Sequence, residues 1–237
     1  MKPVAIDLFC GLGGWTEGLL KEGYRVRGYD IEAHEYDGER YPAELTLADC
    51  LTLDGAQFAD ADLIVASPPC TEYSYMAMPW SRAKQIARAL RGKDSFPEGY
   101  TGSRTLAELN ALFDASFRIQ CEACEAAGRH IPLIVENVRG AIPWVGRSRW
   151  NYGSFHLWGD VPALMPSAKA AIVEEGMKNT GGSWFGVAPD GRKVMPNNAR
   201  AGSKSNARKA ASARIAKIPL PLSRWVAATF HPERIAA

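Results

Sequence analysis

The sequence predicts an α/β fold with a doubly wound, mostly parallel sheet and a small, irregular C-terminal region. Three observations lead to this prediction. Short apolar segments alternate with helical patterns over residues 3–140, most of these segments end in an acidic residue, and the alternation weakens after Asn151. Strands that are apolar throughout are typical of parallel sheets covered by helices on both faces.

The elements follow from these patterns in chain order. The expected strands are the apolar runs at 3–9, 24–32, 45–50, 61–67 and 131–138. The expected helices are 15–23 and 105–128, which both stop at a glycine, a short piece at 81–91 inside the irregular stretch 70–103, and 218–230 behind a proline. Residues 152–166 could hold one or two further strands.

The composition is that of an ordinary globular protein. The 237 residues are 46% apolar and 23% charged, and no apolar run approaches the roughly 18 residues of a membrane span. The N-terminus reads as a first strand rather than an export signal. Five cysteines, an odd number, favour reduced thiols. We therefore expect a cytoplasmic protein without a membrane segment or a bound metal.

The net charge of +2 hides an asymmetry along the chain. Residues 191–217 hold eight Lys or Arg and no Asp or Glu, which leaves 20 basic and 26 acidic residues elsewhere. A basic tract rich in Gly, Ser and Asn indicates contact with a polyanion such as nucleic acid. A solvated loop would have the same composition, so charge alone leaves both interpretations open.

A glycine-rich turn follows the first expected strand. Gly11, Gly13 and Gly14 in "CGLGG" allow a tight turn and a close approach to a ligand, although a purely structural turn would look alike. Asp30 ends the next strand about 20 residues on, where an acid can bind ribose hydroxyls, so an adenosine-containing cofactor is indicated. The sequence lacks the phosphate loop of ATP hydrolases.

The carboxyl ends of the expected strands carry chemically useful side chains, and this is the edge at which parallel sheets bind ligands. These residues are Asp7, Asp30, Asp49, Cys70 and Glu136. In "SPPC", Pro68 and Pro69 restrict the backbone and hold the next side chain at the sheet edge. Cys70 is thus a candidate nucleophile, with an inert buried thiol as the alternative.

Three motifs together resemble a known family. "DLFCGLGG", "SPPC" and "ENV", in this order and each at a strand end, are similar to motifs of the DNA cytosine-5 methyltransferases, and the remainder resembles compact phage-type members. The resemblance implies a Rossmann-like class I S-adenosylmethionine-dependent methyltransferase fold. It also implies S-adenosylmethionine as the methyl donor and double-stranded DNA as the partner of a monomeric enzyme.

The resemblance also implies roles for individual residues. Cys70 would attack carbon 6 of a flipped-out cytosine, and Glu136, followed by Asn137, would bind the base. The cofactor residues would be Asp7, Phe9, Gly11, Gly13, Gly14, Asp30, Ile31, Asp49, Cys50 and Pro68. The DNA-contacting residues would be Ser74, Arg82, Arg88, Lys204 and Arg208.

The sequence departs from the family at several points. The family's Gln-x-Arg-x-Arg motif is absent, and Arg147 and Arg149 in "GRSRW" are the candidates to replace it. Thr71 stands where the family often has Gln, and "AKIPLPLSRW" replaces the late Gly-Asn segment. We divide the chain into a cofactor-binding catalytic domain (1–159), a small basic target-recognition region (160–213) and a C-terminal helix that returns to the catalytic domain (214–237).

Two alternatives to a cytosine-5 methyltransferase stay open. One is an enzyme that transfers a different group derived from S-adenosylmethionine to cytosine. The other is a catalytically dead scaffold that binds DNA or acts against restriction. An amino-methylating enzyme is disfavoured because Ser67 and Cys70 occupy the positions that would hold a polar acceptor and an aromatic ring.

Overall fold

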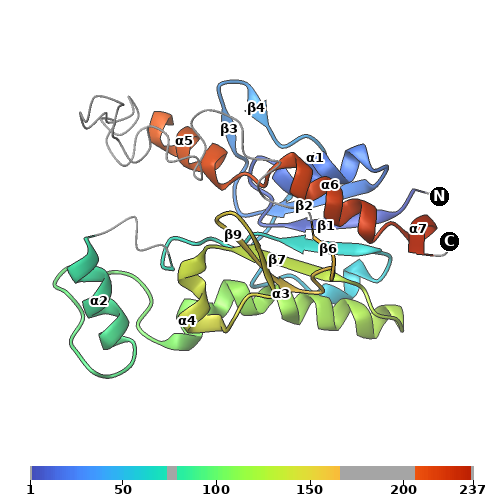
Figure 1. The fold of residues 1–237 in the computed structure, drawn as a ribbon. Helices are drawn as coiled ribbons and strands as arrows, with labels where there is room; N and C mark the ends of the chain where they lie inside the picture. Colours follow the sequence, from blue (N-terminus) through green and yellow to red (C-terminus); the bar gives the residue numbers. More distant parts are fainter. Residues whose placement is uncertain (1, 74–78, 166–205, 236–237) are drawn as a thin grey trace.

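A seven-stranded, mostly parallel sheet forms the centre of the molecule in the computed structural model (Figure 1). The structure describes residues 2–73, 79–165 and 206–235. The strand order is β5-β2-β1-β6-β7-β9-β8. The strands are β1 (Val4–Leu8), β2 (Arg25–Asp30), β5 (Glu44–Leu47), β6 (Leu63–Ala66), β7 (Leu133–Asn137), β8 (Trp150–Tyr152) and β9 (Phe155–Gly159).

Helices cover both faces of this sheet. On one face lie α1 (Gly14–Lys21) and α6 (Leu220–Thr229), which pack on each other, and on the other lies α3 (Leu106–Ala127) (Figure 1). The shorter elements are the hairpin β3 (Glu35–Tyr36) and β4 (Glu39–Arg40), the 3-10 helices η1 (Gly55–Phe58) and η3 (Arg139–Ala141), and the helices α2 (Trp80–Ala89), α4 (Ile142–Val145), α5 (Asn206–Ala216) and α7 (Pro232–Ile235).

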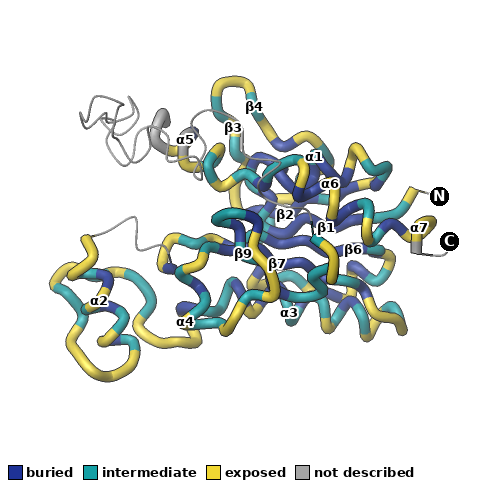
Figure 2. Tube along the Cα trace, viewed as in Figure 1, coloured by how far each residue is buried: buried dark blue, intermediate teal, exposed yellow. Residues whose placement is uncertain are grey.

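The core lies in two layers, because alternate residues of each strand point to opposite faces. In β6, Leu63 and Val65 pack toward α1 and α6, whereas Ile64 and Ala66 pack toward α3, and all four are fully buried. Figure 2 shows this buried centre surrounded by more exposed helices. The expected doubly wound α/β fold is therefore confirmed, with apolar strands buried on both faces.

The chain order places a topological switch point between β1 and β6. From β1 the chain continues to β2 and β5 on one side and then returns to β6 and β7 on the other. Connections diverge from the carboxyl ends of β1 and β6, and such a divergence leaves a crevice for ligands. Beyond β7 the sheet continues with β9, which is antiparallel to β7, and then with β8, which is antiparallel to β9.

Local sequence explains the helix that flanks this edge. Thr105 and Glu108 form a capping box at the start of α3, and Gly128 ends the helix in a left-handed conformation (φ 65°). The helix therefore matches the expected range 105–128.

Within the described residues, no helix has both the length and the apolar character needed to cross a membrane.

Candidate cofactor and catalytic site

The turn after β1 is shaped by left-handed backbone conformations. Phe9, Gly11 and Gly13 have φ values of 57°, 50° and 78°. Phe9 is not a glycine, and holding it there costs on the order of 1–3 kcal/mol. The Gly11 amide donates a 2.9 Å hydrogen bond to Oδ2 of Asp30 at the end of β2. This bond joins the glycine turn to the acid predicted to bind ribose.

A cavity of about 530 Å³ lies at this carboxyl edge, within the range of small-molecule sites. Seven residues predicted to bind a cofactor line it: Phe9, Gly11, Gly14, Asp30, Ile31, Asp49 and Cys50. Ile31 is 72% exposed, so its apolar side chain is accessible to a ligand in the cavity. Phe9 and Ile31 offer apolar contacts for a flat ring, and the Asp30 carboxylate offers an acceptor for a diol. An adenosine group has both of these parts, so the lining fits it.

Asp30 presents a charged carboxylate to this cavity. Partial burial raises its pKa, but hydrogen bonds from His34 and from the Gly11 and Glu32 amides outweigh burial, so the pKa lies below its usual value. His34 Nε2 lies 3.6 Å from Oδ1 of Asp30, and this contact raises the pKa of His34. Sequence reasoning missed His34, which also lines the cavity; its position four residues after Asp30 was the only signal.

Asp7 lies behind the cavity rather than in its wall. Its carboxyl is 1% exposed, and Oδ2 accepts a 2.6 Å hydrogen bond from Thr16, whose hydroxyl also contacts Tyr41 at 2.7 Å. Burial raises the pKa of Asp7 to about 8. Asp7 thus lies in the contact between β1 and α1 and not in the lining of the cavity, where a cofactor contact was expected. The reason is that its side chain points from β1 into the core toward Thr16.

Gly13 and Pro68, also predicted to touch the cofactor, do not line the cavity. Gly13 is the N-cap of α1, and a Cβ on it would come within 2.5 Å of Pro42. Its hydrogen atom is therefore needed for packing. The carbonyl of Pro68 faces β7, whereas its neighbour Pro69 lines the cavity.

The candidate nucleophile and the candidate base-binding residues lie at the ends of adjacent strands. β6 and β7 are parallel, with Ala66 opposite Val135, so Cys70 and Glu136 follow at the same edge. Asn137 Nδ2 donates a 2.9 Å hydrogen bond to the Pro68 carbonyl, which ties the two strand ends together. Glu136 is 8% exposed, and Cys70 is partly buried between two residues that line the cavity, Pro69 and Thr71.

Arg147 and Arg149 lie away from this edge. Both line a separate cavity of about 370 Å³ together with Gln120, His130 and Asp160. Asp160 donates its amide to the carbonyl of Leu133, the first residue of β7, so this cavity opens toward the amino end of that strand. The physical reason is the direction of β8. Because β8 is antiparallel to β9 and β9 is antiparallel to β7, β8 runs in the same direction as β7, and the residues that precede β8 lie toward the amino end of the sheet.

The arginine nearest in sequence to the end of β7 is instead Arg139, which begins η3 and is exposed. Opposite Asn137 in the sheet lies His156 of β9, whose Nδ1 is 2.9 Å from the Ser148 hydroxyl. Burial and the nearby Arg139 lower the pKa of His156. Sequence reasoning missed both residues, because the strand pairing that brings His156 to Asn137 has no local signal.

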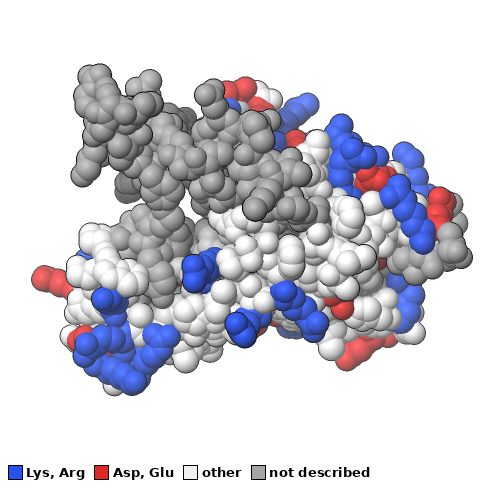
Figure 3. All heavy atoms as spheres, viewed as in Figure 1, with Lys and Arg blue, Asp and Glu red and all other residues white. Residues whose placement is uncertain are grey.

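Two predicted DNA-contacting residues lie on the projecting segment around α2. Arg88 pairs with Asp94 at 3.3 Å, and Arg82 reaches the Glu98 carbonyl at 3.5 Å. Figure 3 shows Lys and Arg side chains gathered over this segment at the lower left of the face. Ser74 and Lys204 lie outside the described residues, and Arg208 belongs to α5.

The chain returns to the cavity through α5 and the residues that follow it. The cavity lining includes Ala213, Ala216, Lys217 and Ile218, and the Ile218 backbone lies against Gly14 of the glycine turn. Lys217 Nζ is 2.7 Å from Glu17 of α1 and 2.6 Å from Glu39 of β4. These ion pairs therefore hold the C-terminal segment, which forms one wall of the cavity, against the first third of the chain.

No group of three or more His, Cys, Asp or Glu in the described part of the chain is arranged to hold a metal ion. The site offers the carboxyl groups of Asp30, Asp49 and Glu136, the thiol of Cys70 and the backbone amides of the glycine turn. This set can bind a nucleoside and place a nucleophile beside it.

Comparison with solved structures yields weak likenesses. One is a protein described as a DNA modification methyltransferase encoded within a prophage of E. coli, with 19% identity and a TM-score of 0.31 over 60% of this chain and 33% of that one. Another is the S. pombe Dnmt2 methyltransferase, with 15% identity and a TM-score of 0.31 over 62% of this chain and 37% of that one. The chain thus spans about a third of each, and neither likeness supports a conclusion at these TM-scores.

No curated protein matches the sequence. The family model described as C-5 cytosine-specific DNA methylase matches residues 4–82. The matched segment contains the glycine turn, Asp30, the wall formed by Asp49 and Cys50, and Cys70 at the end of β6. Over this first third of its length, the chain is thus similar to the C-5 cytosine-specific DNA methylases.

Proposed function

We propose that the protein is a DNA cytosine-5 methyltransferase that uses S-adenosylmethionine and flips its target cytosine out of double-stranded DNA. One observation carries the proposal: a cavity suited to a nucleoside borders the strand end that holds Cys70, and a hydrogen bond from Asn137 joins that strand end to the one that holds Glu136. The match of residues 4–82 to the family model of C-5 cytosine-specific DNA methylases supports this reaction class.

The residues have complementary roles in this proposal. Asp30 accepts hydrogen bonds from the ribose hydroxyls, Phe9 and Ile31 contact the adenine faces, and Asp49 accepts from the adenine amine. The bound cofactor supplies an electrophilic methyl group. The glycine turn allows the backbone to approach the cofactor closely.

Cys70 supplies the nucleophile. Its thiolate forms a bond to carbon 6 of cytosine, and Glu136 hydrogen-bonds ring nitrogen 3 and the exocyclic amine. Carbon 5 thereby gains electron density and would take the methyl group as the bond between that group and the sulfonium sulfur breaks, with S-adenosylhomocysteine as the leaving group. Loss of the proton from carbon 5 and cleavage of the bond between sulfur and carbon 6 then restore the aromatic ring and the free thiolate.

The base is inaccessible inside a duplex, so the protein must hold it outside the stack, at a cost of a few kcal/mol. The basic segment around α2 suits contacts with phosphates beside the flipped base. We assign target recognition to residues 160–213, most of which lie outside the described part of the chain. We expect the protein to act in the cytoplasm and to work as a monomer.

Covalent trapping tests the proposal. Duplex DNA of mixed sequence with 5-fluorocytosine is incubated with the protein and S-adenosylmethionine, and adducts are resolved on a denaturing gel. Fluorine blocks loss of the group at carbon 5, so the wild type should accumulate an adduct that Cys70→Ala abolishes. Cys121→Ala is the matched control, because Cys121 is an exposed thiol on α3, and it should retain the adduct.

The other outcomes separate the alternatives. Binding of S-adenosylhomocysteine is measured by calorimetry beside the gel. Binding without an adduct would contradict methyl transfer to cytosine and favour another group or substrate. Absence of both binding and adduct would favour a scaffold that contacts DNA without catalysis.

A further inference from the structure

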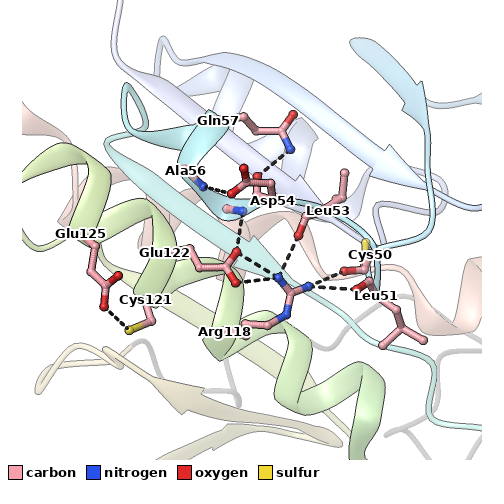
Figure 4. Close-up of polar contacts among 11 residues, drawn as sticks. Cys50, Leu51, Leu53, Asp54, Ala56, Gln57, Arg118, Cys121, Glu122 and Glu125 are labelled. Atoms are coloured by element: carbon pink, nitrogen blue, oxygen red, sulfur yellow. Dashed lines mark hydrogen bonds and ion pairs between the residues drawn. The ribbon is translucent and has the colours of Figure 1, made fainter.

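Arg118 of α3 lies against the loop that forms the adenine side of the cavity. This loop runs from Asp49 to Gly55 and connects β5 to η1, and its first two residues line the cavity. Figure 4 shows the Arg118 guanidinium pointing into the loop from the helix. None of the sequence motifs includes Arg118, and it does not line the cavity itself.

The guanidinium gathers three carbonyl groups of the loop. Nη1 donates to the Leu53 carbonyl at 2.8 Å, and Nη2 donates to the carbonyls of Cys50 and Leu51 at 3.1 and 3.2 Å. Carbonyl oxygens that face the same way repel one another, and a single cation between them offsets the repulsion. The loop conformation therefore depends on a planar, multivalent donor, which only Arg provides.

Glu122, one helical turn after Arg118, completes the contact. Its carboxylate accepts from Arg118 Nη1 at 2.9 Å and from the Gly55 amide at 2.7 Å. The Gly55 hydrogen bond and Arg118 together lower the pKa of Glu122. The loop also lies close to the helix at Gly55, where a Cβ would approach the Ile119 carbonyl within 2.2 Å. One Arg–Glu pair thus fixes both ends of the loop.

The loop in turn orients Asp49. The Leu51 amide donates to Asp49 Oδ1 at 2.9 Å, and the Thr52 amide donates to the Asp49 carbonyl at 2.9 Å. No described residue forms a hydrogen bond with Oδ2 of Asp49, and Asp49 faces the cavity. The position of that acceptor is therefore set by the turn that Arg118 holds.

We infer that Arg118, with Glu122, is a positioning residue for the adenine group of the cofactor: it acts on the ligand only through the loop that carries Asp49 and Cys50. The inference rests on the proposed cofactor role of the cavity. It predicts that Arg118 contributes to affinity for any ligand with an adenine group, whatever is attached to the ribose.

Two ligands and two variants test this assignment. Calorimetry measures the affinity of Arg118→Lys and Arg118→Met for S-adenosylhomocysteine and for adenosine. Lys provides one point charge in place of a fork, so both variants should bind both ligands about tenfold or more weakly, by the same factor for each ligand. Initial rates at saturating cofactor should stay close to the wild-type rate, because only the KM for the cofactor rises.

Arg129→Lys is the matched control. Arg129 also reaches a backbone carbonyl, that of Ala61 at 2.8 Å, and pairs with Asp62 at 3.5 Å, but it does not line the cavity. Its variant should bind both ligands like the wild type. Glu122→Gln, which keeps the side-chain shape, gives an intermediate loss of affinity and serves if the Arg118 variants fold poorly.

The outcomes are distinct. Folded Arg118 and Glu122 variants with wild-type affinity for both ligands would overturn the inference, as would an equal loss of affinity in Arg129→Lys. Failure of the wild type to bind either ligand would contradict the proposed cofactor site, and the inference with it.

Discussion

Asn137 Nδ2 donates a hydrogen bond of 2.9 Å to the carbonyl of Pro68, across the ends of two parallel strands. Asn137 is 1% exposed, and its own Oδ1 accepts from the Val138 amide at 2.8 Å. The carbonyl of Pro68 lies two residues before Cys70. The side chain that follows Glu136 therefore fixes the backbone that leads to the candidate nucleophile.

Removal of this hydrogen bond should reduce catalysis more than cofactor binding. In Asn137→Ala the Pro68 carbonyl loses its partner inside the protein, and a displacement of Cys70 by a fraction of an ångström lowers the rate of attack. We expect the rate of adduct formation with 5-fluorocytosine DNA to fall about tenfold to 100-fold. Affinity for S-adenosylhomocysteine should remain that of the wild type, and a parallel loss of affinity would contradict this division.

Substitution of Asp30 should have the opposite signature. Asp30 lines the cavity, and its Oδ2 accepts from the Gly11 amide, so Asp30→Ala removes the expected ribose acceptor and loosens the glycine turn. Charge-assisted hydrogen bonds of this kind contribute about 1.5–3 kcal/mol, which corresponds to a loss of cofactor affinity of roughly tenfold to 100-fold. Calorimetry measures it. Asp60→Asn, on an exposed residue paired with Arg27, is the control and should bind normally.

Asp7 should make stability fall as the pH rises. Its pKa is about 8 in the folded protein and 3.8 in its usual state, so between these values the folded state holds a proton that the unfolded state has lost. The free energy of unfolding then decreases by about 1.4 kcal/mol for each pH unit from this group alone.

Asp7→Asn replaces the protonated carboxyl with a neutral amide and should remove this contribution. Urea denaturation from pH 5 to pH 8.5 should give a variant whose stability relative to the wild type increases steadily with pH. Parallel curves for the two proteins would show that Asp7 is ionised in the fold and would contradict the prediction. A protonated carboxyl agrees with the burial of Oδ1, to which no described residue forms a hydrogen bond.

Close packing of α1 against α6 makes Gly18 intolerant of substitution. A Cβ on Gly18 would come within 2.2 Å of Ser223 Oγ and 2.5 Å of the Arg224 amide nitrogen. Overpacking of this kind costs about 2–3 kcal/mol, so Gly18→Ala should lower the free energy of unfolding by that amount. Leu20→Ala on the same helix, where the side chain is 40% exposed, should cost much less. Equal losses in the two variants would contradict this account.

Sequence patterns predicted the parallel part of the fold because its strands are apolar throughout and its helices have clear ends. All five expected strands are present, and the helix at 105–128 has a capping box and a C-terminal glycine that can be read from the sequence. The hairpin β3–β4 escaped prediction because its strands are two residues long and mostly polar. Helix α5 escaped because its basic composition looks like that of a loop.

The candidate site could be predicted where a residue with a characteristic role, such as an acid or a glycine, directly follows or ends a strand. Asp30, Asp49 and the glycine turn lie at the cavity for this reason. Asp7 shows the limit of the rule, because the sequence cannot tell a side chain that points past the strand end from one that points into the core. The place of Arg147 and Arg149 depends on the direction in which β8 runs in the sheet, and that of Arg118 depends on how α3 packs. Neither placement has a local signal in the sequence.

The ends of the segment at 166–205 have a practical consequence for engineering. On one side, Trp225 of α6 donates to the Leu164 carbonyl at 2.9 Å, and on the other, Arg214 pairs with Asp37 at 2.8 Å. Both anchors belong to the body that contains the cofactor cavity. If residues 160–213 recognise the target as proposed, we expect segments of different length and sequence to be exchangeable between these two anchors, which would allow libraries of altered target preference to be built on one catalytic body.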